Sequence, residues 1–158
     1  MNIWTFDFSL NPKVVDVIEQ QLTRGKDGGV YVYAFSLGGL TKVGSSRFPY
    51  ERLLTHLRNA RKQYGQLNEF VVSLSIPIPD GRLREKAIHK LLEKNLKQGR
   101  EIFNVSLDEA TTTMEDVFSD VESEKITRLW FTKPLFSIPQ RRDVMNQLLG
   151  IKKQKVFI

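Results

Sequence analysis

Residues 29–44 read GVYVYAFSLGGLTKVG, and this stretch predicts a β-hairpin. Its first half is β-branched and aromatic, which strands favour. Gly38 and Gly39 then supply a tight turn, after which the chain can return as a second strand. The predicted strands are residues 30–35 and 40–44.

Helices and one further strand are expected around the hairpin. Asn11 followed by Pro12 is typical of a helix start, and Ser106 with Glu109 has the spacing of a capping box. Apolar residues recur at helical spacing in residues 12–24, 50–63 and 82–97. In residues 69–78, β-branched residues alternate with serine as in a strand. The expected elements are helices at 12–24, 50–63 and 82–97, a strand at 69–78, a short strand or loop at 101–105, an acidic helix beginning near 107 and a last helix at 137–149.

The order of these elements predicts an α+β fold, in which a small three-stranded antiparallel sheet is flanked by helices and followed by a helical C-terminal extension. With 158 residues, of which 41% are hydrophobic, the chain suits one principal core. The expected organisation is an N-terminal helical segment at 1–27, a central domain at 28–106 and an extension at 107–158. In that extension an acidic helix precedes a basic tail.

The net charge of +6 is unevenly distributed along the chain. Residues 47–62 carry five basic side chains and one acidic, and residues 82–100 carry seven basic and two acidic. Residues 108–124 carry seven acidic side chains and no basic one, whereas residues 125–158 carry eight basic and one acidic. The two basic segments suit a polyanion such as nucleic acid, although lysine and arginine are also typical of solvated helix faces.

Composition excludes several kinds of chemistry. The chain has no cysteine, which removes disulfides, thiolate zinc sites and cysteine nucleophiles, and two histidines alone do not make a zinc site. Catalysis would have to use carboxylates, Tyr, His, Ser, Lys, Arg or a hard cation. Apolar runs fall short of the roughly 18 to 20 residues that span a bilayer, and the first residues lack a signal-peptide pattern. We therefore expect a soluble, intracellular protein, in cytoplasm or nucleus, with no membrane partner.

Four short motifs follow one another within residues 28–106. They are Gly29-Val30-Tyr31 with, ten residues later, Lys42-Val43-Gly44; Arg52 and His56 as R-x-x-x-H; Glu85 and His89 as E-x-x-x-H; and Gly99-Arg100-Glu101-Ile102-Phe103. In this order they resemble the GIY-YIG nuclease superfamily, and specifically its T5orf172 branch, which has lysine in place of the second motif's tyrosine. Ile102 departs from the tryptophan that is usual in that branch.

The resemblance implies a metal-dependent endonuclease that hydrolyses phosphodiester bonds in DNA, in a branch often encoded by phages and other viruses. In the superfamily a helix glutamate holds a single Mg²⁺ or Mn²⁺ ion, an arginine faces the phosphate, and the first-motif tyrosine takes part in activating the nucleophile. The matching residues here are Glu85, Arg52 and Tyr31. Tyr33 is the second choice for the tyrosine, because alternate residues of a strand share a face.

The helical phase of Glu85 agrees with this role. On a helix, Leu92 and Leu96 fall within about 20° of Glu85, so its carboxylate shares the face that packs on the sheet. An unpaired charge is costly there, and a bound cation would neutralise it. The alternative is that Glu85 is angled outward or pairs with a nearby arginine.

Other motif residues are candidates for the same site, and a purely structural role is the alternative for each. Lys42 and His56 could contact phosphate or assist proton transfer, and Gly44 would allow a close approach of substrate or a helix. His89 and Asn104 could support the site from nearby. Further phosphate contacts are expected from basic side chains of the flanking segments: Arg47, Arg58, Arg61, Lys62, Lys86 and Lys90.

Two other hypotheses fit the same sequence. In the first, the domain keeps the nuclease fold but serves as a nucleic-acid or protein adaptor, which the missing second tyrosine favours. In the second, the acidic segment 108–124 of one subunit meets the basic segment 125–158 of another, giving a homo-oligomer; the alternative is that the two segments pair within one chain. RNA is an alternative to DNA as the partner, because the chain carries no pattern typical of a sequence-specific DNA-reading module.

Overall fold

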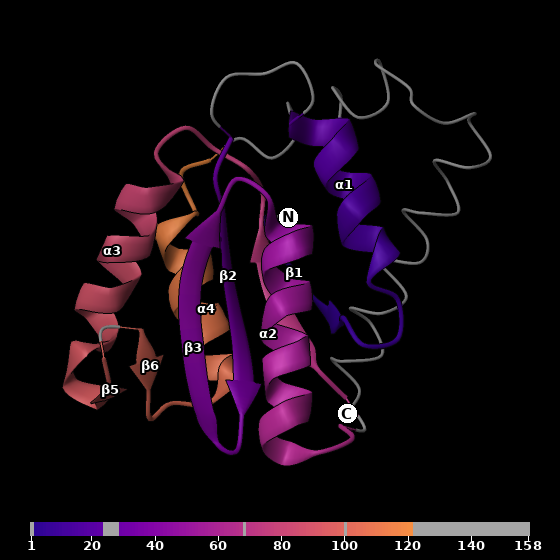
Figure 1. The fold of residues 1–158 in the computed structure, drawn as a ribbon. Coiled ribbons are helices and arrows are strands. Elements are labelled where there is room, and N and C mark those ends of the chain that lie inside the picture. Colours follow the sequence, from indigo (N-terminus) through magenta and orange to yellow (C-terminus); the bar gives the residue numbers. More distant parts are fainter. Residues whose placement is uncertain (1, 24–28, 68, 100, 122–158) are drawn as a thin grey trace.

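The computed structural model describes residues 2–23, 29–67, 69–99 and 101–121. These residues form three layers, with one sheet between two layers of helices (Figure 1). Helix α2 (Pro49–Tyr64) packs on one face of the sheet with α1 (Lys13–Thr23) beside it, and α3 (Gly81–Leu92) and α4 (Leu107–Val117) pack on the other. No helix in the described ranges is long and apolar enough to cross a membrane.

The sheet has six antiparallel strands in the order β1-β4-β2-β3-β6-β5. They are β1 (Ile3–Asp7), β2 (Tyr31–Leu37), β3 (Leu40–Ser46), β4 (Val71–Ser75), β5 (Leu96–Gln98) and β6 (Ile102–Phe103). The α+β class and the hairpin with its following strand are confirmed, but the prediction of three strands was wrong. The additional strands are short, and β1 finds its partner nearly 70 residues along the chain, so local patterning gives little sign of them.

Helix α3 is shorter than predicted. The expected helix at 82–97 ends at Leu92, and a 3₁₀ turn (Glu93–Asn95) and strand β5 follow. Leu96 continues the apolar spacing of α3, yet it lies in β5 and is 46% exposed. Gly99 has a φ of +60° and lies between β5 and β6, where a positive φ favours glycine.

The described residues of the predicted N-terminal segment and C-terminal extension share one core with the central part of the chain. Phe6 of β1, Met114 of α4 and Phe118 just beyond it are buried in the same hydrophobic cluster. The Asn2 side-chain amide also donates a hydrogen bond to the Phe118 carbonyl oxygen at 2.6 Å. The predicted helix at 137–149 and the basic segment at 125–158 lie outside the described residues.

Helix α4 begins where the sequence predicts. The Ser106 side chain accepts a hydrogen bond from the Glu109 backbone N–H at 3.1 Å, which confirms the predicted cap. Leu107, Ala110 and Met114, spaced three and four residues apart, then face the sheet and are buried.

Because Met114 is fully buried in the common core, Met114→Ala should lower the free energy of unfolding by about 2 to 5 kcal/mol, through lost burial and the cavity it leaves. Urea denaturation measures this change. The matched control is Glu115→Ala, one residue along and exposed, which should stay within about 0.5 kcal/mol of wild type. Equal stability of the two variants would mean that α4 is no part of the core.

Candidate active site

The Tyr33 hydroxyl lies at the centre of a cluster of polar side chains. Tyr33 is on β2, is 1% exposed, and its Oη lies 3.1 Å from Nε2 of His56 on α2. Burial raises the pKa of the Tyr33 hydroxyl, and the neighbouring Arg52 guanidinium offsets part of that rise. The hydroxyl therefore stays protonated at neutral pH and is hydrogen-bonded inside the protein.

Gly44 makes room for the Tyr33 ring. The two residues are directly opposite each other in the β2–β3 pair, so their side chains would share one face of the sheet. A Cβ atom added at Gly44 would lie 2.6 Å from Tyr33 Oη and 2.7 Å from its Cζ, so any larger residue would force the Tyr33 ring to shift. Of the roles that the sequence left open for Gly44, the structure supports close approach, and the group that approaches is the Tyr33 ring.

His56 is a neutral imidazole at neutral pH. Its pKa falls from 6.5 to about 4, chiefly because the ring is buried and also because the positive charges of Lys42 and Arg52 disfavour protonation. The ring also packs against Phe35, with 4.8 Å between centroids. A neutral imidazole has one donor and one acceptor nitrogen, so one nitrogen can engage Tyr33 while the other remains for a second partner.

Two positive charges flank this histidine. Arg52 precedes it by one turn of α2 and is exposed. Lys42 is opposite Phe35 in the β2–β3 pair, and its Nζ lies 3.5 Å from Oε2 of Glu101. Both cations are near enough to His56 to lower its pKa, and the charge of Lys42 is partly offset by Glu101.

Glu85 of α3 approaches from the other side of β3. Its side chain is 14% exposed and accepts a hydrogen bond from the Ser45 hydroxyl at 2.5 Å. His89, one turn later, has its Nε2 3.5 Å from Glu85 Oε2 and 3.0 Å from the Val43 carbonyl oxygen. The prediction that Glu85 faces the sheet is confirmed, and the outward-pointing alternative is wrong.

The two groups of side chains meet at an edge of the sheet. β6 pairs with β3 at Thr41 and Lys42, and no strand in the described residues pairs with the far end of β3 on that side. Helix α3 runs beside this edge (Figure 1). Both Glu85 and Glu101 are near enough to the Tyr33 hydroxyl to raise its pKa. The cluster therefore wraps around the end of β3, although its members come from opposite faces of the sheet.

The donor set fits one type of metal site. No group of three or more His, Asp or Glu side chains within the described ranges could hold an ion by itself. Mg²⁺, however, is commonly held by one or two carboxylates together with water and substrate phosphate. Each oxygen of the Glu85 carboxylate has one close protein neighbour and a second lone pair that could face an ion. Glu85 therefore fits a single hydrated Mg²⁺ or Mn²⁺ ion that the substrate completes.

The remaining candidates fall in three places. Tyr31, the tyrosine that the sequence preferred, is fully buried opposite Ser46, and the polar cluster gathers on Tyr33 instead. Asn104 is exposed after β6, and no interaction found among the described residues joins it to Tyr33 or Glu85. The basic side chains that the sequence predicts for phosphate contacts are all exposed: Arg47, Arg58, Arg61 and Lys62 near or on α2, and Lys86 and Lys90 on α3.

Sequence reasoning missed Ser45, the hydrogen-bond donor to Glu85. The signal was the position of Ser45 directly after Gly44 on the strand. Neighbouring strand residues face opposite sides of a sheet, so the Ser45 side chain lies on the face away from Tyr33. Helix α3 packs on that face.

The family model described as the T5orf172 domain matches residues 28–118, which is more than half of the chain. The matched range begins just before β2 and ends just after α4, so it contains every residue of the cluster. No curated protein and no solved structure matches the chain.

The depressed pKa of His56 predicts how stability depends on pH. In the unfolded chain His56 should bind a proton with a pKa near 6.5, whereas in the folded protein its pKa is about 4. Protonation between these two pH values therefore favours the unfolded state. As the pH falls from about 7.5 to 5, this protonation should lower the free energy of unfolding of wild type by about 2 kcal/mol. The variant His56→Gln has no such group, so it should not show this loss. Urea denaturation of both proteins at the two pH values measures the difference, and parallel losses would show that His56 titrates normally.

Proposed function

The chain belongs to the T5orf172 domain family, which is associated with the GIY-YIG-like nucleases, and from that premise we propose that it is a metal-dependent endonuclease hydrolysing phosphodiester bonds in DNA. The observation that carries the proposal is the convergence of His56, Arg52 and Lys42 with the Glu85 carboxylate around the Tyr33 hydroxyl. This combination offers an anion site, a neutral base and a metal ligand at one edge of the sheet.

The scissile phosphate would sit against Arg52 and Lys42. A guanidinium can hold two phosphate oxygens through a fork of N–H donors, and a lysine ammonium adds a point charge. The exposed basic side chains of α2 and α3 would contact neighbouring phosphates of the same strand: Arg58, Arg61, Lys62, Lys86 and Lys90. Both helices contribute side chains to the cluster, Arg52 and His56 from α2 and Glu85 from α3.

His56 would take the proton of the attacking water. With Nε2–H donating to Tyr33 Oη, the other ring nitrogen keeps its lone pair and can accept that proton as the water oxygen bonds to phosphorus. A phosphate bound to Arg52 and Lys42 neutralises the charges that depress the pKa of His56, which makes it a stronger base when substrate is present. In this scheme Tyr33 is a positioning residue that holds the His56 ring in place through Nε2.

Arg52 would stabilise the extra negative charge that develops on the phosphoryl oxygens during attack. The bond from phosphorus to the leaving oxygen then breaks, and that oxygen gains a proton from solvent. A divalent ion on Glu85 would supply Lewis-acid stabilisation of the same oxygens when bound. Ser45 and His89 would hold the Glu85 carboxylate in position for it.

A second candidate is a DNA-binding module that does not cleave. The observation favouring it concerns Lys42, which stands where the wider superfamily has a second tyrosine and lies 3.5 Å from the Glu101 carboxylate. This ion pair occupies a position from which a tyrosine could contribute to catalysis. Salt-sensitive DNA binding by the wild-type protein, with no cleavage of any DNA tested in Mg²⁺ or Mn²⁺, would favour this candidate.

Glu85→Gln should slow Mg²⁺-dependent nicking of plasmid DNA by about 100-fold or more, because the amide cannot replace the charge that holds the ion. The amide oxygen can still accept the Ser45 hydrogen bond, so the thermal midpoint should change little. Glu93→Gln, an exposed carboxylate next to α3, is the matched control and should nick like wild type. Nicking by Glu85→Gln at the wild-type rate would contradict the proposed mechanism.

A further inference from the structure

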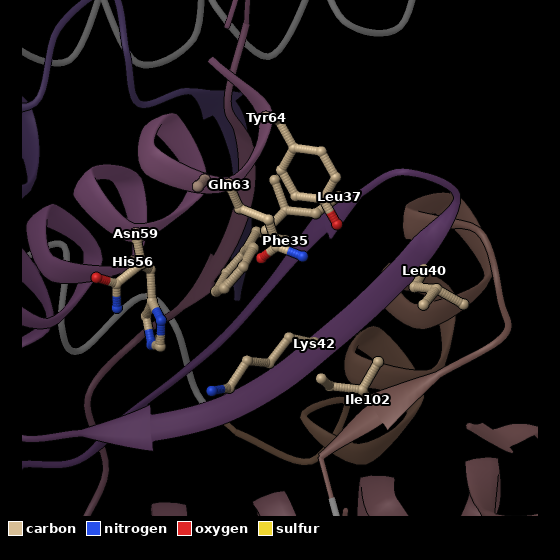
Figure 2. A pocket seen from close by; sticks show the side chains of 10 residues that line it. Phe35, Leu37, Leu40, Lys42, His56, Asn59, Gln63, Tyr64 and Ile102 are labelled. Atoms are coloured by element: carbon tan, nitrogen blue, oxygen red, sulfur yellow. The ribbon is translucent and has the colours of Figure 1, made fainter. Parts of the chain in front are cut away.

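A groove of about 350 Å³ opens between the second half of α2 and the β2–β3 hairpin (Figure 2). This volume is at the small end of the range of roughly 300 to 1,000 Å³ that is typical of ligand pockets. Its floor is apolar and includes Phe35 of β2, Leu40 of β3 and Ile102 of β6. The floor can therefore accept a flat, largely apolar group.

Tyr64, the last residue of α2, supplies an aromatic wall at the rim of the groove. Its side chain is 48% exposed. The ring leans over the hairpin turn, because a Cβ atom added at Gly38 would lie 3.7 Å from Tyr64 Oη. An aromatic ring held at the rim in this way offers a face on which a planar ligand can stack.

Two carboxamides complete the lining. Asn59 and Gln63 are four residues apart on α2, so they lie on the same side of the helix, and both border the groove (Figure 2). Each carboxamide presents a donor and an acceptor side by side, which is the pattern that pairs with the polar edge of a nucleobase. Among the described residues that line the groove none carries a carboxylate, and the nearby Glu101 is paired with Lys42.

The groove is continuous with the candidate active site, because Lys42 and His56 line both. We propose that the groove binds an unpaired nucleobase of the nucleotide next to the phosphate that Arg52 and Lys42 hold. This inference rests on the proposed function. A base inside a duplex is stacked and cannot enter such a groove unless it leaves the helix. The preferred substrate is therefore single-stranded or locally unpaired DNA.

The test is the affinity of the full chain for two labelled oligonucleotides, measured by fluorescence anisotropy without divalent ions so that no cleavage occurs. One probe is a mixed-sequence single strand, and the other has the same length and charge but is abasic throughout. Wild type should bind the base-containing probe about tenfold or more tightly. The double variant Gln63→Ala with Tyr64→Ala should lose most of that ratio and keep its affinity for the abasic probe.

Arg61→Ala with Lys62→Ala is the matched control, because these exposed residues directly precede the variant pair on α2. It should weaken binding to both probes alike and reduce the salt dependence. A ratio near one in wild type, or a ratio that survives in the Gln63–Tyr64 double variant, would overturn the base-binding groove but leave the proposed function standing. Failure of wild type to bind either probe would also overturn the base-binding groove, whereas the proposed function is tested separately by the nicking of plasmid DNA.

Discussion

The contact between the Tyr33 ring and Gly44 sets the geometry on which the rest of the site depends. The β2–β3 register places these residues opposite each other, and a glycine there lets the ring approach the strand closely with its hydroxyl near His56. A register shift of one residue would turn every side chain of the strand to the other face of the sheet. The tight turn at Gly38 and Gly39, both with positive φ, helps to fix that register.

The position of the cluster at the sheet edge explains how it draws on both helical layers. Side chains from opposite faces of a sheet are normally separated by the strands between them. At the far end of β3 that separation ends, so Glu85 from α3 and Arg52 from α2 can both act on the Tyr33 hydroxyl. Positive charge on the α2 side would suit a phosphate, and the carboxylate on the α3 side would suit the cation bound to that phosphate.

Much of this arrangement could be predicted because its signals are local. The glycine turn, the Ser106 cap and the spacing from Glu85 to Leu92 each depend on residues close in sequence, and the structure bears all three out. Strand β1 could not be predicted in the same way, because its partner β4 is distant in sequence. The end of α3 was misjudged because Leu96 continues the helical spacing although it belongs to β5.

The choice between Tyr31 and Tyr33 lay beyond sequence reasoning, because strand periodicity gives both rings the same face. In the structure Tyr33 is opposite Gly44 and its hydroxyl lies 3.1 Å from His56 Nε2, whereas Tyr31 is opposite Ser46. The most direct test of the account is therefore the single-turnover rate of DNA cleavage by Tyr33→Phe and by Tyr31→Phe, two changes that each remove one buried hydroxyl. We expect Tyr33→Phe to slow cleavage by about 100-fold while Tyr31→Phe cleaves at nearly the wild-type rate. A slow Tyr31→Phe beside an active Tyr33→Phe would contradict the account.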